Sequence, residues 1–191
     1  HRQSATYTCS AFSYDNEVLT LAKMPGALNI RWSRPLGGKP TTVIVSKDQA
    51  GRYFVSIRAK EAIRVKPITP SMVGIDLGLS HVAILSSGEK IGNPRFLKKD
   101  EERLKRAQQD LSRKKLGSKN RAKARKKVAR IHARVADRRN DYLHKLTTAL
   151  INENQVICAE SLKVKNPTLA KAISDVGWGE LTRQLSPLRK G

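Results

Sequence analysis

The chain has 191 residues, of which 38 are Lys or Arg and 16 are Asp or Glu, so its formal net charge is +22. A folded protein with this imbalance repels itself unless a polyanion neutralises it. Nucleic acid is the favoured partner, because displacing condensed counterions from phosphates rewards many Lys and Arg. No segment has the length of a membrane span or the layout of a signal peptide, so we expect no membrane partner.

The first 70 residues have the pattern of a small β-rich module. Residues 1–15 show no clear period, and turn chemistry such as Pro25-Gly26 then separates short alternating runs. Strands at this spacing predict a small antiparallel barrel or sandwich. The expected strands cover residues 18–21, 27–32, 42–46 and 52–59, and residues 60–70 are expected to be a linker.

A single carboxylate, Asp76, stands within the apolar run Val73–Ser80, and a second apolar run, His81–Leu85, follows at once. An acid at the exposed end of an apolar strand is typical of a divalent-metal ligand. The Asp76 side chain could equally cap the following turn, and this stretch alone does not separate the two interpretations. A third strand is expected over residues 93–97.

Residues 98–153 have the pattern of a basic hairpin of two long helices. Gly117 ends the first helix and Ser118 caps the second. The second helix is expected to bury Val128, Ile131, Val135, Tyr142, Leu146 and Ala149. Its remaining positions carry Lys and Arg with little acid among them, which favours a phosphate-facing surface over a merely solvated one. The expected nucleic-acid-binding residues are Arg113, Lys114, Lys115, Lys119, Arg121, Lys123, Arg125, Lys126, Lys127, Arg130, Arg134 and Arg138.

A second apolar run with one acid, Val156–Leu162 containing Glu160, follows the hairpin, and a helix is expected over residues 167–185. The hairpin is long enough to serve as the crossover between two parallel strands. Asp76 and Glu160 would then meet at one edge of a sheet, where neighbouring carboxylates require cations. Nucleases that use two metal ions on a phosphodiester have this layout.

Several of these runs together resemble TnpB, the family of transposon-encoded, OrfB-type RNA-guided nucleases. They are Gly74–Leu79, the basic hairpin, Ala159–Leu162, Gly177-Trp178-Gly179, and the strand at 51–56, which looks like the last strand of the family's wedge domain. The resemblance covers about residues 18–185. It implies an α/β chain with a wedge-like β module and linker in residues 1–70 and a RuvC-like domain with an RNase H fold in residues 71–191.

The resemblance also implies a chemistry and a set of partners. Asp76 and Glu160 would be catalytic, Mg²⁺- or Mn²⁺-binding carboxylates, and a guide RNA would direct cleavage of target DNA. The expected location is cytoplasmic and nucleoid-associated, and the expected state is a monomer.

Two parts of the family pattern do not occur in this sequence. The family's zinc ribbon of paired Cys-x-x-Cys motifs is missing, because the only cysteines are Cys9 and Cys158, and no acid follows Glu180 as a third catalytic Asp. We therefore expect no structural Zn²⁺, an internal or truncated fragment, and weak or absent cleavage. A non-catalytic nucleic-acid-binding protein of the same family is the alternative. A third interpretation is an actin-like ATPase, whose fold also begins with a strand containing Asp-x-Gly. It is disfavoured because the sequence has no later Gly-rich phosphate loop.

Overall fold

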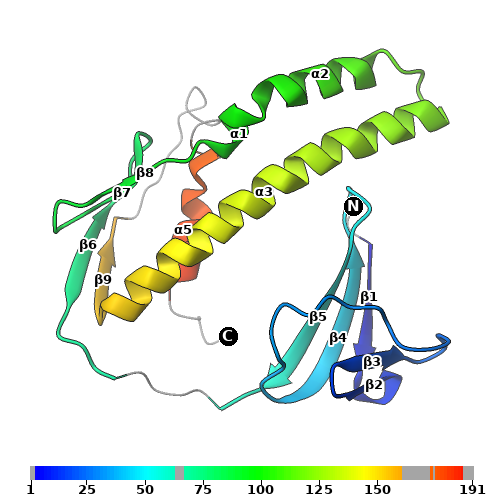
Figure 1. Ribbon diagram of the computed structural model, residues 1–191, viewed down its shortest axis with the longest axis horizontal. Helices are drawn as coiled ribbons and strands as arrows, with labels where there is room; N and C mark the ends of the chain where they lie inside the picture. The colour runs from blue at the N-terminus through cyan, green and yellow to red at the C-terminus, as the bar shows by residue number, and fades with distance from the viewer. Residues whose placement is uncertain (1–2, 63–66, 161–172, 174, 187–191) are drawn as a thin grey trace. The chain divides into compact units, whose positions relative to one another are not determined.

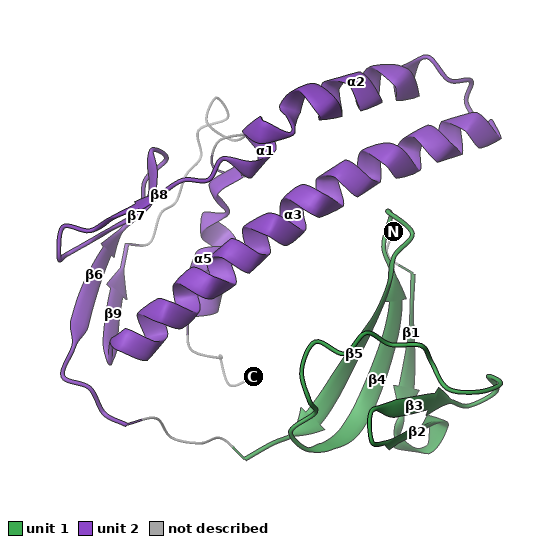
Figure 2. Ribbon diagram, viewed as in Figure 1, with its two compact units in different colours: residues 1–66 green, residues 67–191 purple. Residues whose placement is uncertain are grey.

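The computed structural model describes residues 3–62, 67–160, 173 and 175–186. The chain is a mixed α/β protein that divides into two compact units, residues 1–66 and 67–191 (Figure 2). Each unit has its own hydrophobic core.

Unit 1 contains two antiparallel sheets built around one core. Strand β4 lies between β1 and β5 in the larger sheet, and β2 pairs with β3 in the smaller one. The core centres on Leu19, Leu21 and Val43, against which aromatic residues of the module pack. The described strands form no single closed barrel. Their bounds are β1 Gln3–Thr8, β2 Phe12–Asp15, β3 Val18–Leu21, β4 Lys39–Lys47 and β5 Tyr53–Lys60, and a short 3-10 helix, η1 Cys9–Ala11, joins β1 to β2.

Residues 3–15, for which no element was predicted, form β1, η1 and β2. One expectation for unit 1 was wrong, because residues 27–32 are not a strand. The backbone N–H of Leu28 donates to the carbonyl of Leu19, but the chain then leaves the sheet edge. Leu28, Ile30 and Trp32 still pack against the core. Alternation therefore predicted which side chains are buried, but burial does not require a hydrogen-bonded neighbouring strand.

Unit 2 is built on a four-stranded sheet with the order β8-β7-β6-β9. Strands β6, β7 and β8 are antiparallel neighbours, whereas β9 pairs in parallel with β6 after the long helical crossover (Figure 1). The bounds are β6 Met72–Asp76, β7 His81–Leu85, β8 Lys90–Gly92 and β9 Val156–Ala159.

The strand expected at residues 93–97 was misplaced. Strand β8 ends at Gly92, and helix α1 covers Phe96–Lys99. Between them Asn93 donates a side-chain hydrogen bond to the carbonyl of Leu79, and Arg95 has a φ of 49°. A left-handed residue of this kind reverses the chain direction, so the segment turns into a helix instead of extending the sheet.

The hairpin consists of α2, Glu101–Ser112, and α3, Lys119–Glu153, as expected. Gly117 has a φ of 76°, and the Ser118 hydroxyl accepts a hydrogen bond from the backbone N–H of Arg121 at 3.1 Å. The Ser118 hydroxyl confirms the predicted cap of α3. The predicted stop is misplaced, because α2 already ends at Ser112 and Gly117 turns the chain in the loop before the cap. The C-terminal half of α3 and helix α5, Trp178–Leu185, pack against the sheet (Figure 1). No described helix is both long enough and apolar enough to cross a membrane.

The predicted buried face of α3 is correct at Ile131 and Val135. Tyr142 and Leu146 are partly buried and pack on the core of unit 2, and the prediction is wrong at Ala149. Ala149 is exposed, whereas Leu143 and Leu150 are buried in the core of unit 2. The reason is a change of partner: the first half of α3 packs on α2, and the second half packs on the sheet and α5. Of the expected helix over 167–185, the structure describes residues 173 and 175–185, and residues 161–172 and 174 lie outside the described part of the chain. Gly177, with a φ of 77°, interrupts this helix just before α5.

Candidate functional site

Asp76 and Glu160 end two neighbouring parallel strands. The register of β6 and β9 runs from Met72 opposite Val156 to Ile75 opposite Ala159. One further step along both strands places Asp76 opposite Glu160, and the backbone N–H of Glu160 donates to the carbonyl of Ile75 at 3.5 Å. Because adjacent strands lie about 4.8 Å apart, the two carboxylates start from neighbouring backbone positions. The structure therefore brings the predicted pair together.

The two acids lie on the side of the sheet that faces away from the core. Val73 and Ile75 point into the core of unit 2, so the alternating positions at Gly74 and Asp76 belong to the opposite face. A shallow hollow of about 570 Å³ lies there, and Asp76, Glu160 and Cys158 are all exposed. The hollow is lined by Gly74, Ile75, Asp76, Ile84, Leu85, Ser86, Cys158, Ala159 and Glu160.

Neither carboxylate has a hydrogen bond or ion pair to any described residue. Many other acids of this basic chain are paired, such as Asp100 with Arg138 at 3.2 Å and Asp141 with Lys145 at 2.7 Å. A turn-capping role for Asp76 would require its side chain to accept a backbone N–H from the following residues, and the described part of the chain contains no such bond. The capping interpretation is therefore not supported.

The donor set suits a hard divalent cation but is small. Carboxylate oxygens are preferred ligands of Mg²⁺ and Mn²⁺, and adjacent like charges are destabilising without a cation between them. Among the described residues, however, no group of three or more His, Cys, Asp or Glu is placed to hold a metal ion. Asp76 and Glu160 thus fit one side of a cation site.

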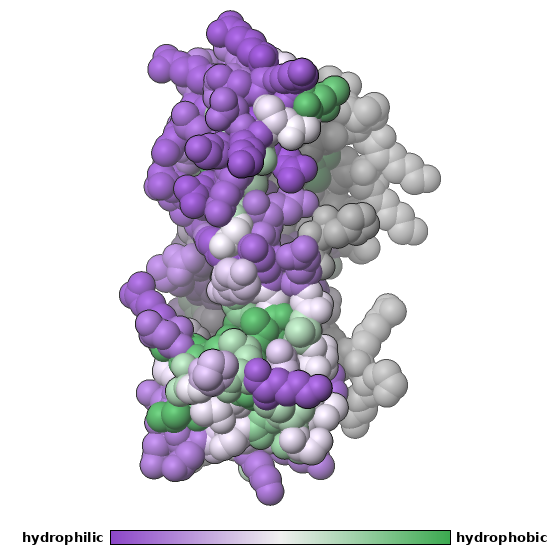
Figure 3. All heavy atoms as spheres, turned by 90° about the vertical axis from the view of Figure 1, so that its right-hand side faces the viewer, coloured by the Kyte–Doolittle hydropathy of each residue, from purple (hydrophilic) through white to green (hydrophobic). Residues whose placement is uncertain are grey.

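The basic hairpin presents a surface dominated by cations. Residues 119–136 of α3 contain eight Lys or Arg and no Asp or Glu. Figure 3 shows that the surface over the hairpin, in the upper part of the view, is almost uniformly hydrophilic. Of the twelve predicted residues, those that are exposed without a described partner are Arg113, Lys115, Lys119, Lys123, Arg125, Lys126, Lys127, Arg130 and Arg134.

Six of these cations form one line along α3, which we call the α3 basic stripe. Each member lies three or four residues from another member, so the six lie on one side of the helix, away from Ala124 and Ile131, which are buried. At 1.5 Å per residue the stripe is roughly 22 Å long. Its members are Lys119, Lys123, Lys126, Lys127, Arg130 and Arg134.

The other three predicted residues have partners within the protein. Arg121 donates to the carbonyl oxygens of Leu111 and Lys114, Lys114 pairs with Asp110 at 3.1 Å, and Arg138 pairs with Asp100. Only the Lys114 pair could be found from the sequence, because Asp110 lies four residues earlier on the same helix. The partners of Arg121 are backbone atoms, and Asp100 is 38 residues from Arg138.

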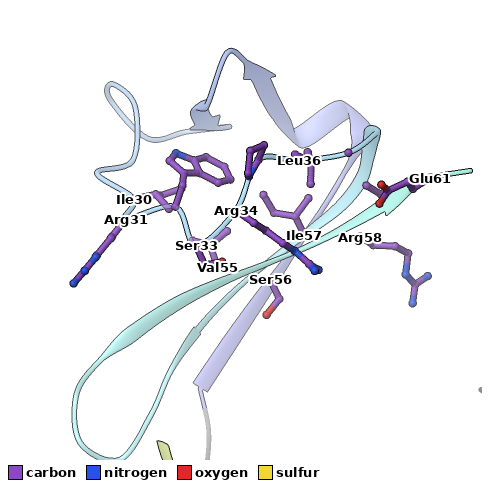
Figure 4. Close-up of a pocket in the computed structure, with 14 residues that line it drawn as sticks. Ile30, Arg31, Ser33, Arg34, Leu36, Val55, Ser56, Ile57, Arg58 and Glu61 are labelled. Carbon is purple, nitrogen blue, oxygen red and sulfur yellow. The ribbon is translucent and has the colours of Figure 1, made fainter. Parts of the chain in front are cut away.

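A second group of surface arginines was missed by sequence reasoning. Arg31, Arg34 and Arg58 line a hollow on unit 1 (Figure 4). They come from a loop and a strand that are separated in sequence, and no local motif connects them.

Comparison with known proteins identifies the family. A model of the OrfB_IS605 family, described as "Probable transposase", matches residues 54–171. A Streptomyces pristinaespiralis protein named "Putative RNA-guided DNA endonuclease" is 54% identical over 190 residues, covering 96% of this chain and 47% of that protein. The Escherichia coli K12 protein "Putative RNA-guided DNA endonuclease InsQ" is 34% identical, covering 90% of this chain and 47% of its own length.

The chain is thus a transposon-type protein, and it belongs to the OrfB_IS605 transposase family. It spans about half the length of these two curated relatives.

Proposed function

We propose that the chain is a RuvC-like part of an RNA-guided DNA endonuclease, in which Asp76 and Glu160 hold the catalytic divalent cation. The parallel register that makes Asp76 and Glu160 neighbours carries this proposal. It is supported by the names of the two relatives, both of which are called RNA-guided DNA endonucleases. In this proposal residues 1–70 form the wedge-like module and residues 71–191 the nuclease domain.

Each part of the site has a distinct task. When bound, Mg²⁺ or Mn²⁺ polarises a phosphodiester and lowers the pKa of a bound water. Asp76 and Glu160 provide oxygen ligands at the ends of rigid strands, which the core on the opposite face of the sheet holds in place. The α3 basic stripe attracts and orients the phosphates of the guide RNA and the target DNA, while base pairing selects the sequence.

The absence of a third metal-binding side chain near these acids favours a second candidate. The described residues supply only two clustered carboxylates, and a cation held by two protein ligands is bound weakly. The alternative function is therefore nucleic-acid binding without strand cleavage, with the basic hairpin and unit 1 as the binding surfaces.

The metal site is tested by titrating Mn²⁺ into the chain in a calorimeter. We expect binding that is lost in Asp76→Asn and in Glu160→Gln and kept in Glu89→Gln, an exposed acid of the turn before β8. Without metal, Asp76→Asn should raise thermal stability slightly, because it removes like-charge repulsion. Equal binding in the parent chain and both site variants would overturn the metal assignment.

Cleavage is tested separately, with Mg²⁺ or Mn²⁺, guide RNA and target DNA. Metal-dependent cleavage that disappears in Asp76→Asn supports the endonuclease. Salt-sensitive binding of nucleic acid that is the same in the parent and Asp76→Asn, with no cleavage in either, supports the binding protein instead.

A further inference from the structure

Unit 1 has a hollow of about 630 Å³ that the proposed nuclease chemistry does not use. Its walls are the loop of residues 30–37 and strand β5 from Val55 to Ala59, with Glu61 at one end (Figure 4). A volume of this size is in the range of sites that take small organic ligands. The hollow lies at the free edge of the sheet, because β5 is the last strand in the order β1-β4-β5.

The aromatic residue of the hollow is held in a fixed orientation. The Trp32 indole N–H donates to the carbonyl of Glu17 at 2.8 Å, and the ring makes an edge contact with Tyr14 at a centroid distance of 5.7 Å. The inner side of the ring packs on the core, yet Trp32 is only partly buried and also lines the hollow. A rigid, partly exposed aromatic ring is a suitable stacking surface, because little side-chain entropy remains to be lost on binding.

Two arginines that line the same hollow, Arg34 and Arg58, have no side-chain partner among the described residues. Arg34 extends across Ile57 towards Arg58, whereas Arg31 points away to the other side (Figure 4). All three arginines are exposed, and their side chains have no hydrogen bond or ion pair with any described residue. Glu61 also lines the hollow and carries a negative charge. Three positive side chains thus outnumber one negative side chain, so the hollow favours an anionic ligand.

The free edge of β5 adds backbone N–H and C=O groups to the hollow. An edge strand presents unpaired backbone N–H and C=O groups along its free side, and no backbone hydrogen bond joins the loop 30–37 to β5 in the described residues. These groups can bond the polar edge of a planar ring stacked on Trp32. A flat polar heterocycle joined to phosphate matches the aromatic surface, the backbone groups and the two arginines together.

We propose that this hollow binds an unpaired nucleotide of a single-stranded nucleic acid. The base stacks on Trp32, and the flanking phosphates pair with Arg34 and Arg58. This contact is separate from the α3 basic stripe, since it lies in the other unit.

The test uses the whole chain and 12-residue oligonucleotides that carry one 5-iodouracil, in an RNA form and in a DNA form. Ultraviolet light cross-links this base to an aromatic ring stacked on it, and mass spectrometry locates the linked peptide. We expect a link to Trp32 that falls at least five-fold in the double variant Arg34→Gln and Arg58→Gln. The matched control is Lys23→Gln with Lys39→Gln, which removes the same charge from exposed positions of unit 1 outside the hollow, and it should keep the link.

The two oligonucleotide forms decide which polymer supplies the nucleotide. A stronger Trp32 link with the RNA form assigns the site to unpaired RNA, and a stronger link with the DNA form assigns it to unpaired DNA. Links that map only to the hairpin, or an equal loss in both double variants, would overturn this site while leaving the proposed nucleic-acid-binding function intact. Absence of any link or binding would count against both.

Discussion

The side chain of Arg121 donates a hydrogen bond of 2.9 Å to the carbonyl oxygen of Lys114, and a second bond of 3.1 Å to that of Leu111. The first turn of α3 is thereby tied both to the last turn of α2 and to the loop that follows it. Arg121 therefore has a structural role in the hairpin. The neighbouring exposed Lys and Arg residues of α3 are instead candidates for binding phosphate.

We therefore predict that Arg121→Gln lowers the free energy of unfolding by about 1–3 kcal/mol, because hydrogen bonds from a charged donor are lost. Lys123→Gln removes the same charge at an exposed position and should change stability by less than about 0.5 kcal/mol. Urea denaturation followed by circular dichroism measures both. Equal stability of the two variants would contradict the structural role of Arg121.

The α3 basic stripe should determine how nucleic-acid binding depends on salt. In the triple variant Lys123→Gln, Lys126→Gln and Arg130→Gln, the slope of log K against log salt should fall by about 2–3, at roughly 0.7–0.9 per lost phosphate contact. A triple variant of unit 1 with the same charge loss, Lys23→Gln, Lys39→Gln and Lys60→Gln, provides the control. If both variants show the same slope, total charge and not the stripe controls binding.

Gly177 and Gly179 flank Trp178 but should respond differently to alanine. Gly177 has a φ of 77°, and an added Cβ would lie 2.9 Å from Arg139 Cδ and 3.2 Å from Leu143 Cδ1. Gly177→Ala should therefore cost about 1–3 kcal/mol, from backbone strain and crowding. Gly179 lies in the first turn of α5 with open space around it, so Gly179→Ala should stabilise the helix by up to about 1 kcal/mol. Thermal unfolding of the two variants distinguishes these effects.

Glu180 should contribute to the acid stability of unit 2. Side-chain hydrogen bonds from Arg183 and then Gln184 lower its pKa from 4.5 to about 2. Because the pKa is lower in the folded protein, the stabilisation is complete above about pH 4.5 and is lost as the pH falls towards 2. The pair is on the surface, so we expect a contribution of only about 1 kcal/mol.

Glu180→Gln should consequently reduce the loss of stability between pH 5 and pH 2. The control is Glu153→Gln, which removes an exposed acid at the end of α3. Denaturation curves recorded at several pH values would contradict the prediction if the two variants had the same pH dependence.

Local signals in the sequence identified much of unit 2 correctly. Gly117 and Ser118 mark the start of α3, because the left-handed residue and the capping hydroxyl act on backbone groups only a few residues away. The two apolar strands that end in Asp76 and Glu160 were recognisable for the same reason: burial of one strand face produces a short-range pattern. Their pairing followed from the length of the crossover between them, and the register confirms that they are neighbours.

Features that depend on a change of packing partner were not predictable in this way. The buried face of α3 shifts to Leu143 and Leu150 where its neighbour changes from α2 to the sheet and α5. Residues 27–32 alternate like a strand, but only Ala27 and Leu28 pair with β3 before the chain leaves the sheet edge. The hollow beside Trp32 brings together a loop and an edge strand that no motif connects.

The sequence by itself determined the basic charge, the start of α3, the apolar strands and the two candidate acids, because each depends on residue chemistry or on neighbours within one or two turns. Only the tertiary structure decided which cations are free and which are bound to carbonyls or acids, and which side of the sheet the acids occupy. Those properties depend on contacts between residues far apart in the chain, such as Arg138 with Asp100, and such contacts exist only after the helices and strands have packed.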